Sequence, residues 1–289
     1  MNKFVVLTDS ACDLPQEMAQ QHHIDILCFK LAMNGEGYTE RVDFTPEQFS
    51  QMLREGDSLP TTAQINQYEF LEKFEEYDRA GVEEVLYISI NATGSGTHAN
   101  AHAAAAQFGE EHPDSPMRIS IVDSHSYSVT YGIEVCRAAK MLADGAQMDD
   151  VVAYLNDRFA RLELVLTAYT LKVIRKSGRV SAAAAIAGDL LSIRPIFTLI
   201  DGVSQVVKKV RGDKQVMTAV IGHCKARMTP GTPYYIGVTN WKYAQDYAKA
   251  AEAAIGYPPE NMFHLGAAVC ANTGPEAVGM LFEGEKRDR

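Results

Sequence analysis

The chain carries a run of glycine and hydroxyl residues, Gly94, Ser95, Gly96 and Thr97, between a predicted strand and a predicted helix. Glycine lets the backbone approach a ligand closely, and the hydroxyls add hydrogen-bond donors that carry no charge. The first turn of the following helix presents free backbone N–H groups, which favour an anion. The run therefore indicates a neutral binding site for a carboxylate or a phosphate monoester.

The same stretch has alternative interpretations as an enzyme site. Gly94-x-Gly96-x-x-Ala99 satisfies the dinucleotide-binding fingerprint, and Asp123 ends the next predicted strand. Ser95 has a glycine directly on each side, whereas a nucleophile elbow needs its glycines two residues away. No Gly-Lys-Ser/Thr triplet occurs in the sequence, which excludes a Walker-type phosphate loop. A purely structural interpretation, a hydroxyl that caps the helix, also fits.

A second hydroxyl pair, Thr61 and Thr62, follows Pro60 in the connection before an earlier predicted helix. In a parallel α/β sheet, the loops at the carboxyl ends of the strands gather in one crevice. We therefore predict that Thr62 and Ser95 converge on one anion. Each hydroxyl pair taken alone is also typical of helix capping.

Composition limits the class of protein. The 289 residues have a formal net charge of −10, which argues against DNA or RNA as a partner. No segment reaches the ~18 apolar residues of a membrane span, and the N-terminal apolar stretch is too short for a signal peptide. The five cysteines are widely spaced, and the eight histidines show no metal-binding set. We expect a cytoplasmic protein with reduced thiols, no metal site and no integral membrane association.

Apolar runs of strand length alternate with amphipathic segments in the first half of the chain. We predict strands at 4–9, 82–90 and 118–124, and helices at 45–56, 68–81, 98–108, 132–145 and 148–162. Such alternation favours a parallel sheet with helices on its faces. In the predicted helix at 45–56, Thr45 can cap the start, Pro46 suits the first turn, and Gly56 can end the helix.

The second half indicates a mixed α/β domain. We predict strands at 164–169, 234–240 and 263–270, helices at 181–191, 213–227 and 243–255, and a hairpin within 194–211 that turns at Asp201-Gly202. The fold class is therefore α/β with two domains. The first, 1–160, carries the head-group site on a parallel sheet, and the second, 161–289, is mixed.

A series of ordered motifs resembles the DegV family of bacterial fatty-acid-binding proteins. Residues 60–64 and 95–97 are similar to the Thr-Ser-Gln and Ser-Gly-Thr motifs of this family. Further similar segments, spread over nearly the whole chain, are 8–15, 122–132, 171–181, 190–197, 208–212 and 272–282.

The resemblance implies two α/β domains that bury a long-chain fatty acid and no other cofactor. It assigns Thr62 and Ser95 as carboxylate ligands, and we expect Thr61, Thr97 and the backbone at Gly96 to assist them. The domain at 161–289 is expected to help enclose the acyl chain. Small-residue runs at 102–108 and 182–188 leave room for that chain or for close helix packing. The protein is expected to be a carrier and not an enzyme.

Some family members present the lipid to the ATP-binding subunit of a fatty acid kinase, which phosphorylates the carboxylate. Arg179 and Arg211 are expected at the portal or partner face. Asn272 stands where the family has a histidine that is linked to this partner, and asparagine carries neither proton nor charge. Ala63 stands where many family members have a serine, and Gly94 stands where the family usually has a leucine. The resemblance therefore predicts lipid binding and leaves the kinase partnership open.

Overall fold

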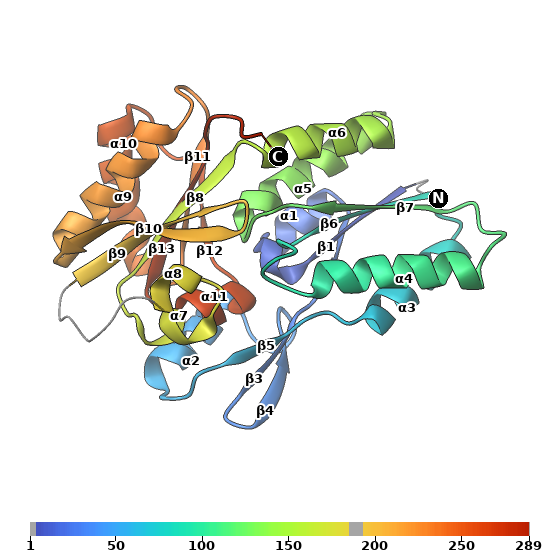
Figure 1. The fold of residues 1–289 in the computed structure, drawn as a ribbon, viewed down its shortest axis with the longest axis horizontal. Coiled ribbons are helices and arrows are strands. Elements are labelled where there is room, and N and C mark those ends of the chain that lie inside the picture. The colour runs from blue at the N-terminus through green and yellow to red at the C-terminus, as the bar shows by residue number, and fades with distance from the viewer. Residues whose placement is uncertain (1–3, 185–192, 289) are drawn as a thin grey trace. The chain divides into compact units, whose positions relative to one another are not determined.

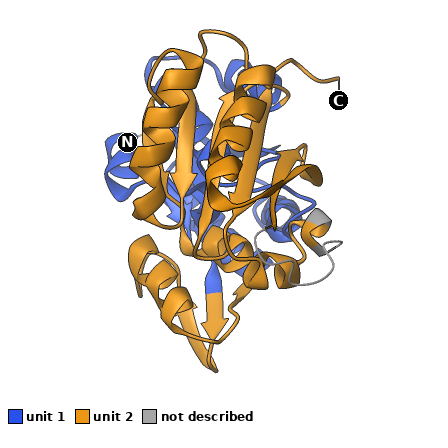
Figure 2. Ribbon diagram, turned by 90° about the vertical axis from the view of Figure 1, so that its left-hand side faces the viewer, with its two compact units in different colours: residues 1–30, 63–159 blue, residues 31–62, 160–289 orange. Residues whose placement is uncertain are grey.

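The computed structural model describes residues 4–184 and 193–288 (Figure 1). The chain forms two compact units, residues 1–30 with 63–159 and residues 31–62 with 160–289 (Figure 2). Residues 31–62 thus group with the later part of the chain. The expected division into folding domains at 1–160 and 161–289 stays a prediction.

The first unit contains a parallel four-stranded sheet in the order β2-β1-β6-β7. Its strands are β1 (Phe4–Asp9), β2 (Ile24–Leu27), β6 (Glu84–Ser89) and β7 (Arg118–Asp123). In β6 every residue after Glu84 is buried, as expected for a strand that is covered on both faces. The predicted parallel sheet is confirmed.

Helices cover both faces of this sheet. They are α1 (Gln16–Gln21), α3 (Gln67–Arg79), α4 (Thr97–Glu111), α5 (Val129–Ala143) and α6 (Met148–Phe159), and a short 3-10 turn spans Ser10–Cys12. Figure 1 shows α5 and α6 on one face and α3 and α4 on the other. The start of α3 is fixed by a capping box, in which Asn66 and Glu69 each accept the other's backbone N–H.

The second unit contains a mixed six-stranded sheet in the order β10-β9-β8-β13-β11-β12. The strands are β8 (Leu162–Ala168), β9 (Ile193–Ile200), β10 (Val203–Arg211), β11 (Tyr234–Val238), β12 (Asn261–His264) and β13 (Ala277–Glu283). Only the β11–β12 pair is parallel. The predicted hairpin is confirmed, since Asp201 and Gly202 at its turn have φ values of 49° and 75°, as a type I′ turn requires.

The helices of this unit are α7 (Lys172–Ser177), α8 (Ser181–Ala184), α9 (Asp213–Arg227), α10 (Ala244–Ile255) and α11 (Ala267–Thr273), with a 3-10 turn at Trp241–Tyr243. Side chains of α9 and α10 share one buried core with the sheet, including Val216, Tyr247, Val165, Ile236 and Met280. Of the helix predicted at 181–191, only α8 lies within the described residues.

The strand predicted at 263–270 is wrong in its second half. β12 ends at His264, and α11 begins after Gly266 at its N-cap. Alanine-rich sequence favours a helix there, and tertiary packing completes it. Cys270 of α11 shares a buried cluster with Phe49 and Leu53 of α2 (Pro46–Glu55).

A small three-stranded sheet accompanies α2, in the order β4-β3-β5. Its strands are β3 (Lys30–Met33), β4 (Glu36–Thr39) and β5 (Thr61–Ala63), and none of them was predicted. Leu31 and Met33 belong to the same cluster as Cys270, which explains why 31–62 groups with the second unit. Among the described residues, no helix is long and apolar enough to cross a bilayer.

Candidate functional site

The hydroxyls of Ser95 and Thr97 lie together at the start of α4. Ser95 Oγ is 2.9 Å from Thr97 Oγ1 and accepts the Thr97 backbone N–H at 3.3 Å. Gly96 occupies the N-cap position, so neither hydroxyl belongs to the capping residue itself. Thr97 is buried and Ser95 half-buried, which leaves Ser95 as the hydroxyl of this pair within reach of a ligand.

Thr97 also fixes the segment that follows β5. Its Oγ1 accepts the backbone N–H of Ile65 at 3.3 Å, and Asn100 Nδ2 donates to the Ile65 carbonyl at 2.7 Å. The side chain of Gln64 packs on Gly96, where an added Cβ would lie 2.1 Å from Gln64 Oε1. The end of the 60–64 motif and the 95–97 motif therefore meet within the first unit.

The loop between β6 and α4 is held by hydrogen bonds from its backbone N–H groups to the ends of the neighbouring segments. The N–H groups of residues 90–92 donate to Asp9 Oδ2 at 2.8 Å, to the Ser126 carbonyl at 2.9 Å and to Asp123 Oδ1 at 3.1 Å. The two carboxylates end β1 and β7, the two neighbours of β6 in the parallel sheet. These anchors preorganise the loop that carries Ser95.

Asp9 is a positioning residue that the sequence analysis missed. Its fully buried carboxylate also accepts the hydroxyls of Tyr131 at 2.6 Å and Tyr87 at 3.0 Å. Burial raises the pKa of Asp9, although these hydrogen bonds act in the opposite direction. The signal in the sequence was an acidic residue at the end of an apolar run. A carboxylate that is buried there needs several hydrogen-bond donors, so it is expected to organise the groups around it.

The glycines of the loop pack against protein side chains. An added Cβ at Gly94 would lie 2.2 Å from the hydroxyl oxygen of Tyr127, which accepts a hydrogen bond from Asn91 Nδ2 at 2.7 Å. Gly96 faces Gln64 in the same way. A dinucleotide fingerprint needs its glycines to approach a pyrophosphate, so this packing argues against that interpretation.

Thr61 and Thr62 lie in β5, and neither caps α3, whose N-cap is Asn66. Thr61 is exposed and Thr62 half-buried. Thr62 belongs to the second unit and Ser95 to the first, and their convergence stays a prediction.

The three residues expected at the portal or partner face all lie in the second unit. Arg179, in the loop after α7, is exposed and donates to the Ser177 carbonyl at 2.9 Å. Arg211 is exposed at the end of β10. Asn272 is half-buried in α11, and its Nδ2 donates to the Ala268 carbonyl at 2.7 Å. This bond holds the asparagine side chain against its own helix.

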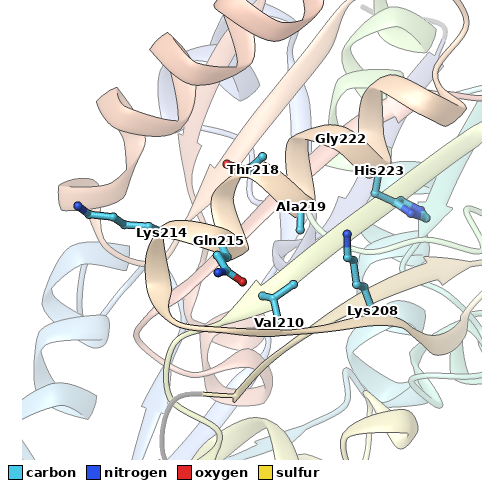
Figure 3. Close-up of a pocket in the computed structure, with 8 residues that line it drawn as sticks. All are labelled: Lys208, Val210, Lys214, Gln215, Thr218, Ala219, Gly222 and His223. Atoms are coloured by element: carbon cyan, nitrogen blue, oxygen red, sulfur yellow. The ribbon is translucent and has the colours of Figure 1, made fainter.

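A groove of about 690 Å³ runs between β10 and α9. Its lining consists of Lys208, Val210, Lys214, Gln215, Thr218, Ala219, Gly222 and His223 (Figure 3). Burial and the charge of Arg227 lower the pKa of His223, and Figure 3 shows its ring beside Lys208. A lining with lysine and glutamine does not suit an acyl chain, and it includes none of the predicted carboxylate ligands.

Comparisons with known proteins connect this arrangement to one family. Residues 3–285 match the family described as "Uncharacterised protein, DegV family". A DegV domain-containing protein of Clostridium perfringens is 29% identical, with 100% of both chains covered. Another, from Caldanaerobacter subterraneus subsp. tengcongensis, is 28% identical over 98% of this chain and 99% of its own.

Solved structures of other proteins have the same fold. A DegV family protein of Thermus thermophilus that binds a fatty acid has a TM-score of 0.85 at 26% identity, covering 99% of this chain and 100% of its own. A stearic acid-binding protein of Eubacterium ventriosum has a TM-score of 0.88 at 22% identity, covering 98% of each chain. The α/β architecture predicted from the sequence is therefore confirmed.

Proposed function

Because the chain belongs to the DegV family, we propose that it binds one long-chain fatty acid, with Thr62 and Ser95 as the carboxylate ligands. Thr61 and the backbone at Gly96 complete the donor set, and Thr97 assists by holding the hydroxyl of Ser95 in place. The proposal rests most directly on the loop at residues 90–97. It is anchored by the carboxylates of Asp9 and Asp123 and offers the half-buried hydroxyl of Ser95 at a helix N-terminus.

The chemistry of such a site is consistent with a carrier. Neutral hydroxyls and backbone N–H groups stabilise a carboxylate without a lysine or arginine. Each methylene that leaves water contributes ~0.8 kcal/mol, so the acyl tail supplies most of the affinity. The site needs no catalytic group for this task. We propose that the protein is a cytoplasmic, non-enzymatic lipid-binding protein. The domain at 161–289 helps to enclose the acyl chain of the bound fatty acid.

Extraction of the purified protein with organic solvent, together with native mass spectrometry, tests the ligand class. We expect about one long-chain fatty acid per chain. A bound dinucleotide would instead support the fingerprint at Gly94-x-Gly96-x-x-Ala99. Purified protein that contains no lipid and hydrolyses ATP without a partner would contradict the proposed carrier function.

We further propose that the bound acid is presented to a separate ATP-binding subunit of a fatty acid kinase, through the face that carries Arg179, Arg211 and Asn272. A reconstituted phosphorylation assay with such a subunit compares the wild type with Asn272→His. Transfer of phosphate with the wild type supports the partnership. Transfer only with Asn272→His would show that Asn272 prevents it.

A further inference from the structure

Two histidines on α4 bring their ring nitrogens together. His98 and His102 are four residues apart, a spacing that puts both side chains on one face of a helix. Their Nε2 atoms lie 3.1 Å apart, and their rings meet edge to face with centroids separated by 4.6 Å. His98 is half-buried and His102 exposed, so the pair is open to solvent on one side.

The other ring nitrogen of His98 lies against the hydroxyl of Ser89. Nδ1 lies 2.8 Å from Ser89 Oγ, which itself donates to the Val122 carbonyl at 3.4 Å. When the Ser89 hydroxyl donates its one hydrogen to the Val122 carbonyl, its oxygen accepts the N–H of His98 Nδ1. In this tautomer of the neutral ring, Nε2 holds the lone pair, on the side of His102. Metal-ligating histidines typically have such a partner on the second nitrogen.

A neutral imidazole is the form that binds metals, and a nearby negative charge favours a bound cation. The carboxylate of Asp123, which also lies 3.2 Å from His125 Nδ1, places a negative charge near the pair.

We propose that Nε2 of His98 and Nε2 of His102 chelate a divalent transition metal ion, with water completing its coordination. Metal–nitrogen bonds of about 2.0–2.1 Å, at octahedral to tetrahedral angles, separate two ligating nitrogens by roughly 3 Å. The observed 3.1 Å matches this separation. Imidazole ligands suit Zn²⁺, Ni²⁺ and Cu²⁺. The site does not depend on the proposed lipid binding, and it differs from the expectation that the histidines form no metal-binding set.

The opposite end of α4 supplies a matched control. The ligand atoms of Glu75, Glu111 and His112 lie within 4.8 Å of one another. His112 already stacks on Phe108, and Glu111 accepts a hydrogen bond from Gln107. A substitution of His112 therefore tests whether any metal binds at that cluster instead.

Calorimetric titration with NiCl₂ tests the proposal on protein that carries no purification tag and has been stripped with EDTA. We expect the wild type to bind one ion. His102→Ala and His98→Gln should each weaken binding by at least about tenfold, because loss of a ligand costs no less than loss of an outer-shell partner. His112→Ala should bind as the wild type does.

Thermal unfolding with and without Ni²⁺ gives a second readout. Binding to the folded state raises the unfolding temperature, so Ni²⁺ should stabilise the wild type and His112→Ala but not His102→Ala. Position 102 is exposed and helical, and alanine favours a helix, so this variant should fold. Wild-type affinity in His102→Ala, loss of binding only in His112→Ala, or no binding by the wild type would each overturn the proposal.

Discussion

The hydroxyl of Thr97 lies 2.9 Å from that of Ser95 and at the same time accepts the backbone N–H of Ile65. Thr97 therefore joins the segment after β5 to the first turn of α4. Because its side chain is buried and already engaged on two sides, its main role is to position Ser95. The site is built from one hydroxyl that faces outward and one that holds it in place.

Replacing Thr97 by valine should destabilise the fold by about 1–3 kcal/mol, because the buried N–H of Ile65 loses its acceptor. Urea denaturation measures the free energy of unfolding. Thr218→Val is the control, since Thr218 is exposed in α9, and it should change that free energy much less. Equal effects of the two substitutions would contradict the positioning role of Thr97.

Gly94→Ala should displace Tyr127, because the new Cβ would lie 2.2 Å from its hydroxyl oxygen. We expect a loss of about 1–3 kcal/mol in the free energy of unfolding, as for other overpacked sites. Gly109→Ala in α4 is the control, since its Cβ meets nothing within 4 Å, and it should stabilise the helix. In a Tyr127→Ala background the cost of Gly94→Ala should shrink, and an unchanged cost would refute the steric explanation.

Asp9→Asn should destabilise the protein by about 1–3 kcal/mol at neutral pH, because the amide nitrogen cannot accept the hydrogen bonds that Asp9 receives. The loop at residues 90–92 should also loosen, which amide hydrogen exchange at Ile90 can measure. Asp114→Asn, at an exposed position, provides the comparison. Unchanged protection of Ile90 would show that Asp9 does not anchor the loop.

His98 predicts a specific dependence of stability on pH. Its folded-state pKa lies below its ordinary value of 6.5, mainly because of burial. The unfolded chain therefore binds a proton more readily, and the stability present above pH 6.5 is lost as the pH falls. Between about pH 7 and 5, unfolding followed in EDTA should show a smaller loss for His98→Gln than for the wild type. Parallel curves would contradict this.

The elements that the sequence predicts well carry their signals locally. β1 and β6 are apolar runs, and α2 has the capping box, first-turn proline and terminal glycine that its residues indicate. The small sheet of β3 and β4 was missed because its strands are short and partly polar. α11 was missed because its first residues continue the apolar run of β12, although alanine favours a helix and packing on α2 completes it.

The candidate site also has a part with a local sequence signal and a part that only the fold brings together. Ser95 and Thr97 stand two residues apart in the chain, so their pattern, taken together with Thr61 and Thr62, indicates an anion site. Asp9 could not be connected to this loop from the sequence, since it meets Tyr131 across a separation of 122 residues. Only the parallel sheet, which brings the carboxyl ends of β1, β6 and β7 to one edge, makes these contacts.

The affinity of delipidated protein for a long-chain fatty acid, compared with the fatty alcohol of equal length, tests the head-group site most directly. Thr62→Val with Ser95→Ala should weaken binding of the acid by roughly 2–5 kcal/mol, because each lost donor costs about 1–3 kcal/mol. The alcohol, which has no carboxylate, should lose much less. Unchanged affinity for the acid, or equal losses for both ligands, would contradict the assignment of Thr62 and Ser95 as carboxylate ligands.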